Sequence, residues 1–319
     1  MTPIEKECRS ISTRIGCTML IFSALLLLQS AVLGLLPHFT APLTAQMAEI
    51  VGEVFSAVLY ALSFTLPLLF FKMISRGHTV PAPRLALELD GEGLCCAFFA
   101  VAVTSMLAFV NAKLVDVFEY SDFSNDYIWQ TEVSENYQLI LLFITMVVVP
   151  AFVEELLFRG LILENLLPCG KTVAIFGSAF LFGMMHQNAE QLLYATGAGI
   201  VFGWIYVRTR SIWPCVLAHF INNFQSVVQL AVAERLPVFR AQAVLYVMEG
   251  MLLVLGVFCG VYLFCKKKPQ ETEYAFTNEA EQLPLRRRAR LFFSVPMTLF
   301  VLWCVAGMLS LILMALFLG

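Results

Sequence analysis

Long apolar stretches, separated by short polar ones, run through nearly the whole chain. A membrane-spanning helix needs about 20 mainly apolar residues, and nine stretches, some of them short, follow that pattern. They are residues 17–36, 50–71, 93–112, 139–164, 172–187, 190–207, 211–232, 241–265 and 291–318. The pattern predicts an all-α fold, a polytopic membrane helical bundle of about nine transmembrane helices.

Composition supports this prediction. The 319 residues are 60% hydrophobic and 13% charged, whereas a soluble domain carries about 25% charged residues. The mean hydropathy is +0.81. We therefore expect residues 1–319 to form a single integral membrane domain in contact with the lipid bilayer. The formal net charge of -3 gives no reason to expect a nucleic-acid partner.

Lys and Arg side chains alternate consistently across the nine predicted spans. They are present before the first span, after the second, fourth and sixth spans, and most densely in the loop at residues 266–290. Since cytoplasmic loops are enriched in these residues, we expect a cytoplasmic N-terminus (N-in) and a basic cytoplasmic loop at 266–290. The acidic loop at 114–137 falls on the opposite side and is interpreted as an aromatic belt or a short interfacial helix.

Six polar residues interrupt the apolar stretches at positions that suggest a shared depth. Helix rise places Glu154, His186 and His219 about 15, 22 and 12 Å from the predicted cytoplasmic ends of their helices, near the middle of a hydrocarbon core of about 30 Å. Ionisable groups at that depth are costly and mark functional sites. The six candidates are Glu154, Glu155, Arg159, His186, His219 and Asn223.

Helical spacing relates these residues to one another. Glu155 and Arg159 share a face at i,i+4 and can form an ion pair, while Glu154 points about 100° away. His219 and Asn223 share the same spacing. A carboxylate kept from bulk water can act as a general base. Taken singly, the Glu155–Arg159 pair and His219 can also be purely structural.

Three motifs, Glu154-Glu155-x-x-x-Arg159, Phe182-x-x-x-His186 and His219-x-x-x-Asn223, resemble those of the CAAX protease and bacteriocin-processing (Abi) family of intramembrane proteases. The similar core covers about residues 139–230. The resemblance implies an endopeptidase in which Glu154 activates water and His186 assists it. It further implies that His219 and Asn223 stabilise the oxyanion, and that Glu155 and Arg159 orient Glu154.

The cofactor and the substrate stay open. Glu154, His186 and His219 can form a zinc site with an open position, but Glu154 and the histidines can also activate water without metal. We expect a membrane-associated protein or peptide as substrate and a location in a bacterial plasma membrane. Two alternatives remain: a proton-linked transporter that uses the buried Glu/His cluster, and a catalytically inactive immunity or scaffold protein. Glu53 and Glu249, also within spans, are interpreted as interface or cavity residues.

Overall fold

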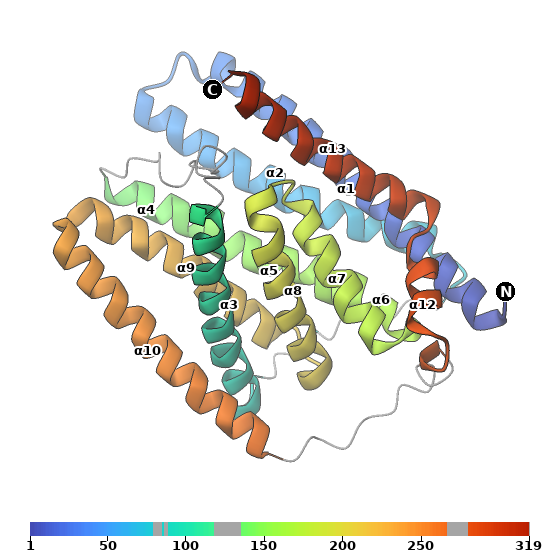
Figure 1. The fold of residues 1–319 in the computed structure, drawn as a ribbon. Coiled ribbons are helices and arrows are strands. Elements are labelled where there is room, and N and C mark those ends of the chain that lie inside the picture. The colour runs from blue at the N-terminus through green and yellow to red at the C-terminus, as the bar shows by residue number, and fades with distance from the viewer. Residues whose placement is uncertain (79–84, 86–88, 118–134, 267–279, 319) are drawn as a thin grey trace.

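Every regular element in the described part of the chain is a helix (Figure 1). The computed structural model describes residues 1–78, 85, 89–117, 135–266 and 280–318. The helices are α1 (Pro3–Thr40), α2 (Ala45–Ile74), α3 (Gly91–Val117), α4 (Asn136–Leu142), α5 (Val149–Glu155), α6 (Glu164–Leu166), α7 (Lys171–Met185), α8 (Ala189–Thr209), α9 (Trp213–Arg235), α10 (Val238–Cys265), α12 (Leu285–Phe292) and α13 (Val295–Leu318). The expected all-α fold is confirmed.

Seven helices of the described chain are long and apolar enough to cross a membrane. The predicted span 139–164 lies within one of them, Asn136–Cys169, which contains α4, α5 and α6. The predicted spans 172–187 and 190–207 correspond to α7 and α8, which are not among the seven. α7 has 15 residues, about 22 Å at the usual helical rise. The count of nine and the N-in orientation stay predictions.

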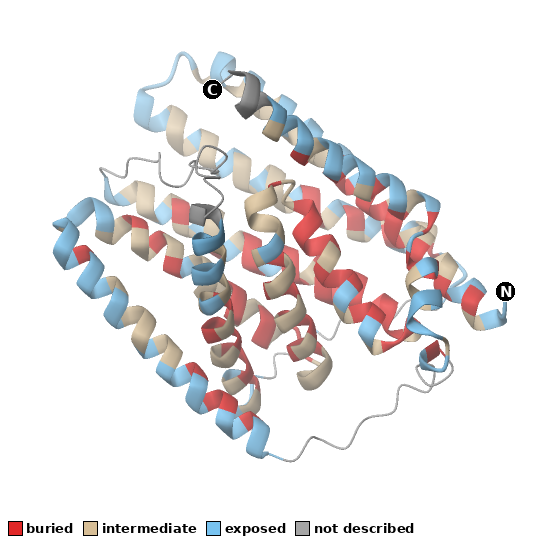
Figure 2. Cartoon of the chain, in the orientation of Figure 1, coloured by how far each residue is buried: buried red, intermediate tan, exposed pale blue. Residues whose placement is uncertain are grey.

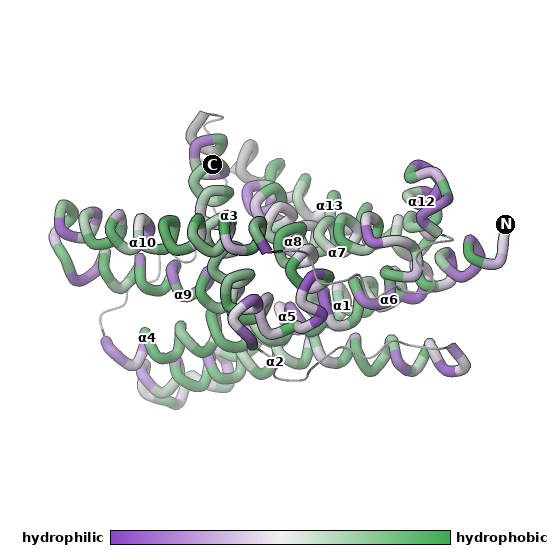
Figure 3. The backbone as a smooth tube through the Cα atoms, turned by 90° about the horizontal axis from the view of Figure 1, so that it is seen from below, coloured by the Kyte–Doolittle hydropathy of each residue, from purple (hydrophilic) through white to green (hydrophobic). Residues whose placement is uncertain are grey.

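Some helix pairs join segments far apart in the sequence, and one pair, α7 with α8, is consecutive. α13 lies along α1, α7 packs on α8, and α10 packs on α3 (Figure 1). The centre of the bundle is buried, while the outer faces of helices such as α10 expose large apolar side chains (Figure 2). Hydropathy stays high along most of each long helix (Figure 3). An apolar outer surface of this kind matches a lipid environment.

The basic loop predicted at 266–290 is partly helical in the described chain. Its described part contains α12, which packs against α1. Arg9 donates hydrogen bonds to the carbonyls of Arg290 and Phe293, and Arg287 pairs with Glu5. The N-terminal basic segment and this loop therefore lie at the same end of the bundle. Residues 118–134, which include most of the acidic loop, and residues 267–279 lie outside the described chain.

Candidate active site

The double glutamate lies at the end of α5, where the helix geometry is irregular. α5 is flanked by π-helical segments at Phe143–Val148 and Leu156–Leu163, and such segments are frequent at functional sites. Pro150 has no N–H to offer the carbonyl of Met146 four residues earlier. The side-chain amide of Asn223 donates to that carbonyl instead, at 2.9 Å. Asn223 therefore links α9 to the interrupted helix that carries the glutamates.

Glu155 joins Arg159 and His219 in one buried arrangement. Its Oε1 accepts from Arg159 Nη1 at 2.7 Å and from His219 Nδ1 at 2.9 Å. Glu155 and Arg159 are both 0% exposed. Breaking a buried pair of this kind typically costs about 3–5 kcal/mol, because it leaves one charge uncompensated. The predicted Glu155–Arg159 pair is therefore present, and it also fixes the ring of His219.

The guanidinium group of Arg159 is held from three directions. It lies 4.7 Å from the ring centre of Phe182 and 5.2 Å from that of Phe202. Its Nη2 donates to the carbonyl of Gly199 at 3.3 Å. Cation–π contacts strengthen when the cation is desolvated. The contact with Arg159 thus gives a physical reason for an aromatic residue at position 182, the first position of the second motif.

Glu154 points away from this arrangement, as the 100° helical rotation predicts. It is 4% exposed, and its Oε1 accepts a 2.5 Å hydrogen bond from the hydroxyl of Tyr60 on α2. Its Oε2 has no hydrogen-bond partner among the described residues and lies 4.0 Å from Nε2 of His219. That separation is too long for a direct hydrogen bond, and a water molecule can bridge polar groups at such distances.

His186 caps the C-terminal end of α7. Its Nδ1 lies 2.8 Å from the carbonyl of Phe182. Because a carbonyl oxygen only accepts, Nδ1 carries a proton and Nε2 of the neutral ring does not. The Phe182 ring contacts both imidazoles, with centroid distances of 5.2 Å to His186 and 6.0 Å to His219. The two histidines are therefore brought together around one phenylalanine.

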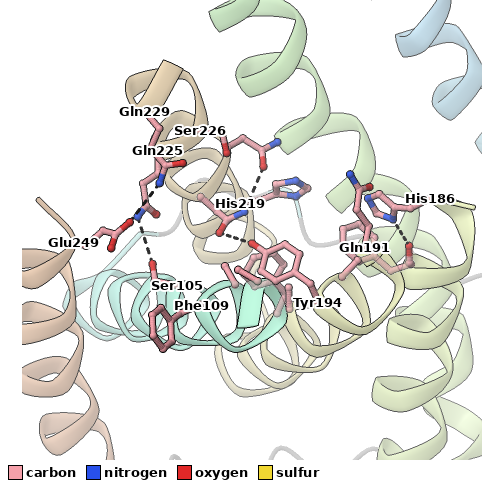
Figure 4. A pocket seen from close by; sticks show the side chains of 18 residues that line it. Ser105, Phe109, His186, Gln191, Tyr194, His219, Gln225, Ser226, Gln229 and Glu249 are labelled. Carbon is pink, nitrogen blue, oxygen red and sulfur yellow. Dashed lines mark hydrogen bonds between the residues drawn. The ribbon is translucent and has the colours of Figure 1, made fainter. Parts of the chain in front are cut away.

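A cavity of about 530 Å³ opens beside these residues (Figure 4). His186, His219 and Asn223 line it. Glu154, Glu155 and Arg159 do not belong to its lining. Glu155 contacts His219 through Nδ1, and Glu154 lies 4.0 Å from its Nε2. The six predicted residues thus form a connected group. Three of them line the cavity, and the other three lie outside its lining, within the bundle.

The zinc site considered for Glu154, His186 and His219 is not formed by this arrangement of donors. Within the described part of the chain, no three His, Cys, Asp or Glu side chains gather as metal ligands. His219 uses Nδ1 for Glu155, and His186 uses Nδ1 for the Phe182 carbonyl, which leaves Nε2 of each ring as the nitrogen that could meet a metal. In this conformation the three side chains are nevertheless not gathered into a three-ligand centre, and we assign no reaction step to a metal.

Two residues outside the motifs belong to the site. Tyr60 contacts Glu154 from 94 positions earlier in the chain, and its hydroxyl within an apolar span is the signal that sequence reasoning passed over. Glu249 lines the cavity. Of its two predicted positions, an interface between helices or a cavity, the structure supports the cavity. Glu53 is not part of that lining.

Comparison with known proteins agrees with the motifs. Residues 136–225 match the family model described as "Type II CAAX prenyl endopeptidase Rce1-like". The "Putative membrane peptidase YdiL" of Bacillus subtilis (strain 168) is 34% identical over 109 residues, which cover 30% of this chain and 44% of that relative. The chain thus matches less than half the length of this curated relative. No solved structure matches the chain.

The family match covers the helices that supply Glu154, His186 and His219. The seven helices that can cross a membrane agree with an integral, multi-pass protein. Residues 136–225 are therefore similar to the CAAX protease and bacteriocin-processing family, as the three motifs predicted.

Proposed function

We propose that the chain is an intramembrane endopeptidase that hydrolyses a peptide bond of a membrane-associated protein or peptide. The environment of Glu154 carries this proposal. Tyr60 holds one of its oxygens, while the other is buried, unpaired and 4.0 Å from Nε2 of His219. A general base must lie within hydrogen-bond reach of the water it activates, and this unpaired oxygen is the acceptor that Glu154 can offer to such a water. The family match and the name of the Bacillus relative support the same activity.

In the proposed reaction, Glu154 takes a proton from water while the water oxygen attacks the carbonyl carbon of the scissile bond. The C–N bond of the tetrahedral intermediate then breaks, and the proton held by Glu154 passes to the departing amine. Positioned acid–base catalysis of this type contributes about 10²–10⁴-fold to the rate. His186 assists because its unprotonated Nε2 can accept the second hydrogen of the water.

His219 and Asn223 are the proposed oxyanion donors. Asn223 uses one hydrogen of its amide for the Met146 carbonyl and has a second to offer. His219 can donate through Nε2 when both ring nitrogens are protonated. The carboxylate of Glu155, which is hydrogen-bonded to Nδ1, stabilises the positive ring in that state. Donors fixed before the reaction begins stabilise a developing negative charge most effectively.

The cavity indicates the size of the substrate segment. A volume of about 530 Å³ lies within the range of about 300–1,000 Å³ that is common for ligand sites. This volume suits a few residues of extended peptide. Its position among α3, α8, α9 and α10 suits a segment that enters from the lipid phase or from the membrane surface.

The test is cleavage by the purified protein in lipid nanodiscs, supplied with a mixture of synthetic apolar peptides. Mass spectrometry of the new peptide ends measures the product. We expect Glu154→Gln to lower product formation by at least about 100-fold, the contribution of a lost general base. Glu53→Gln, a matched change outside the cavity, should keep the activity. Undiminished cleavage by Glu154→Gln would overturn the proposal.

A further inference from the structure

Glu249 is the single charged residue between Arg240 and Lys266, and it lies in a part of helix α10, residues 243–265, that is otherwise apolar. It is 11 residues from the start of this helix and 16 from its end, or about 16 and 24 Å along the axis. A carboxylate so far from both helix ends is costly in a membrane and marks a functional site. The proposed reaction does not use it.

No cation of the described chain offsets this charge. The one hydrogen bond to Glu249 comes from Nε2 of Gln229, at 3.4 Å, and Glu249 forms no ion pair with any described residue. Glu249 lines the same cavity as His186 and His219. In Figure 4, Glu249 lies near one end of the cavity and His186 near the other, with His219 between them.

The wall between His219 and Glu249 is polar. Gln225, Ser226 and Gln229 of α9 line it, and Gln225 is 8% exposed. Gln225 Nε2 donates to the Ser105 hydroxyl of α3 at 3.4 Å, whereas its Oε1 has no hydrogen-bond partner among the described residues. Buried polar groups without a partner are uncommon. Gln225 therefore keeps one unused acceptor in the wall of the cavity.

The helix geometry gives the length of this wall. Gln229, which contacts Glu249, is ten residues after His219 on the same helix. Ten helical residues correspond to about 15 Å, and an extended peptide advances about 3.3 Å per residue. A substrate strand lying along the wall from the histidines to Glu249 would therefore cover four to five residues.

We propose that Glu249 recognises a Lys or Arg side chain of the substrate, four to five residues from the scissile bond. This assignment rests on the proposed endopeptidase function. A cation and a carboxylate are each costly in an apolar phase, and pairing offsets both costs. The substrate is thus a membrane-associated peptide segment with one basic residue near its cleavage site.

The first test uses apolar peptides that carry a single Lys at varied positions, with norleucine or Glu replacing it in matched sets. In lipid nanodiscs, we expect the wild type to cut four to five residues from Lys and to prefer these peptides about tenfold or more, the factor that 1.4 kcal/mol provides. Glu249→Gln should lose this preference. Glu249→Lys should instead prefer the peptides in which Glu replaces Lys. Glu53→Gln should leave it unchanged.

The second test separates recognition from catalysis. In the Glu154→Gln background, fluorescence anisotropy measures binding of a labelled Lys peptide and of its norleucine counterpart. We expect tighter binding of the Lys peptide, and loss of the difference when Glu249→Gln is added. Cleavage by the wild type without preference for Lys, and equal binding of both peptides, would overturn the assignment. Lys-dependent binding without cleavage by the wild type would retain Glu249 as the group that binds Lys, and would reject the endopeptidase together with the stated distance to a scissile bond.

Discussion

The two carboxylate oxygens of Glu154 lie in different surroundings. The Tyr60 hydroxyl holds Oε1 at 2.5 Å, and Oε2 is buried without a hydrogen-bond partner in the described chain, facing His219. In the adjacent residue, Glu155, the carboxylate oxygen Oε1 accepts hydrogen bonds from Arg159 and His219. At the scale of single residues, the two carboxylates each keep one buried oxygen without a partner in the described chain, but the paired oxygen of Glu155 meets a cation and an imidazole whereas that of Glu154 meets a phenol.

We expect Tyr60→Phe to lower kcat about tenfold while KM changes little, because the phenol orients Glu154 and does not line the cavity. Small displacements of a reacting group can cost up to about 10²-fold in rate. Steady-state kinetics on a cleaved peptide measures the two constants separately. Tyr246→Phe, an exposed tyrosine on α10, is the control. A change confined to KM would contradict a role in positioning the base.

At the scale of elements, close helix approach decides which side chains reach the cavity. Gly256 and Gly260 on α10 form a G-x-x-x-G pattern, which is typical of close helix packing in membranes. A Cβ added at Gly256 would lie 2.9 Å from the carbonyl of Phe98, and one at Gly260 would lie 2.9 Å from the ring of Phe99. The contact of α10 with α3 therefore depends on these two glycines, and it brings Glu249 to the cavity.

We expect Gly256→Ala to destabilise the protein by about 1–3 kcal/mol, the usual cost of overpacking, because the new methyl group meets the Phe98 carbonyl and Ala102. Thermal unfolding in detergent measures the change. Gly250→Ala on the same helix is the matched control, since a Cβ there meets nothing within 4 Å. Equal melting temperatures for the two variants would contradict the close packing of α10 on α3.

At the scale of the whole molecule, the site is assembled by helices that are separate in the sequence. Glu154 comes from α5, His186 from the end of α7, His219 and Asn223 from α9, and Glu249 from α10. The bundle brings His219 to Glu155, 64 positions away, and Asn223 to Met146, 77 positions away. The relative placement of these helices therefore determines which donors can act together.

This placement has a consequence for metal dependence. Because no three candidate ligands gather in the described chain, we expect cleavage to persist after treatment with a strong zinc chelator. Elemental analysis of active wild type and of His186→Ala measures bound metal directly. Near-stoichiometric zinc that is lost in His186→Ala, together with chelator-sensitive activity, would contradict this expectation.

The part of the candidate site that could be predicted from the sequence consists of relations within one helix. The i,i+4 spacing predicted the Glu155–Arg159 pair, and the helical rotation predicted the separate direction of Glu154. Tyr60 and Glu249 could not be assigned in this way, since no motif links either residue to the histidines. Their contacts depend on the orientation and the axial position of α2 and α10 relative to the neighbouring helices.

The sequence by itself determined the helical membrane fold, the similarity of residues 136–225 to the CAAX protease family and the choice of the six candidate residues, because apolar length and helical periodicity are properties of neighbouring positions. The tertiary structure alone decided that Glu155 holds His219, that Tyr60 holds Glu154, and that Glu249 lines the same cavity as His186. The physical reason is that periodicity sets which side chains share a face of one helix. Packing between helices sets which faces meet.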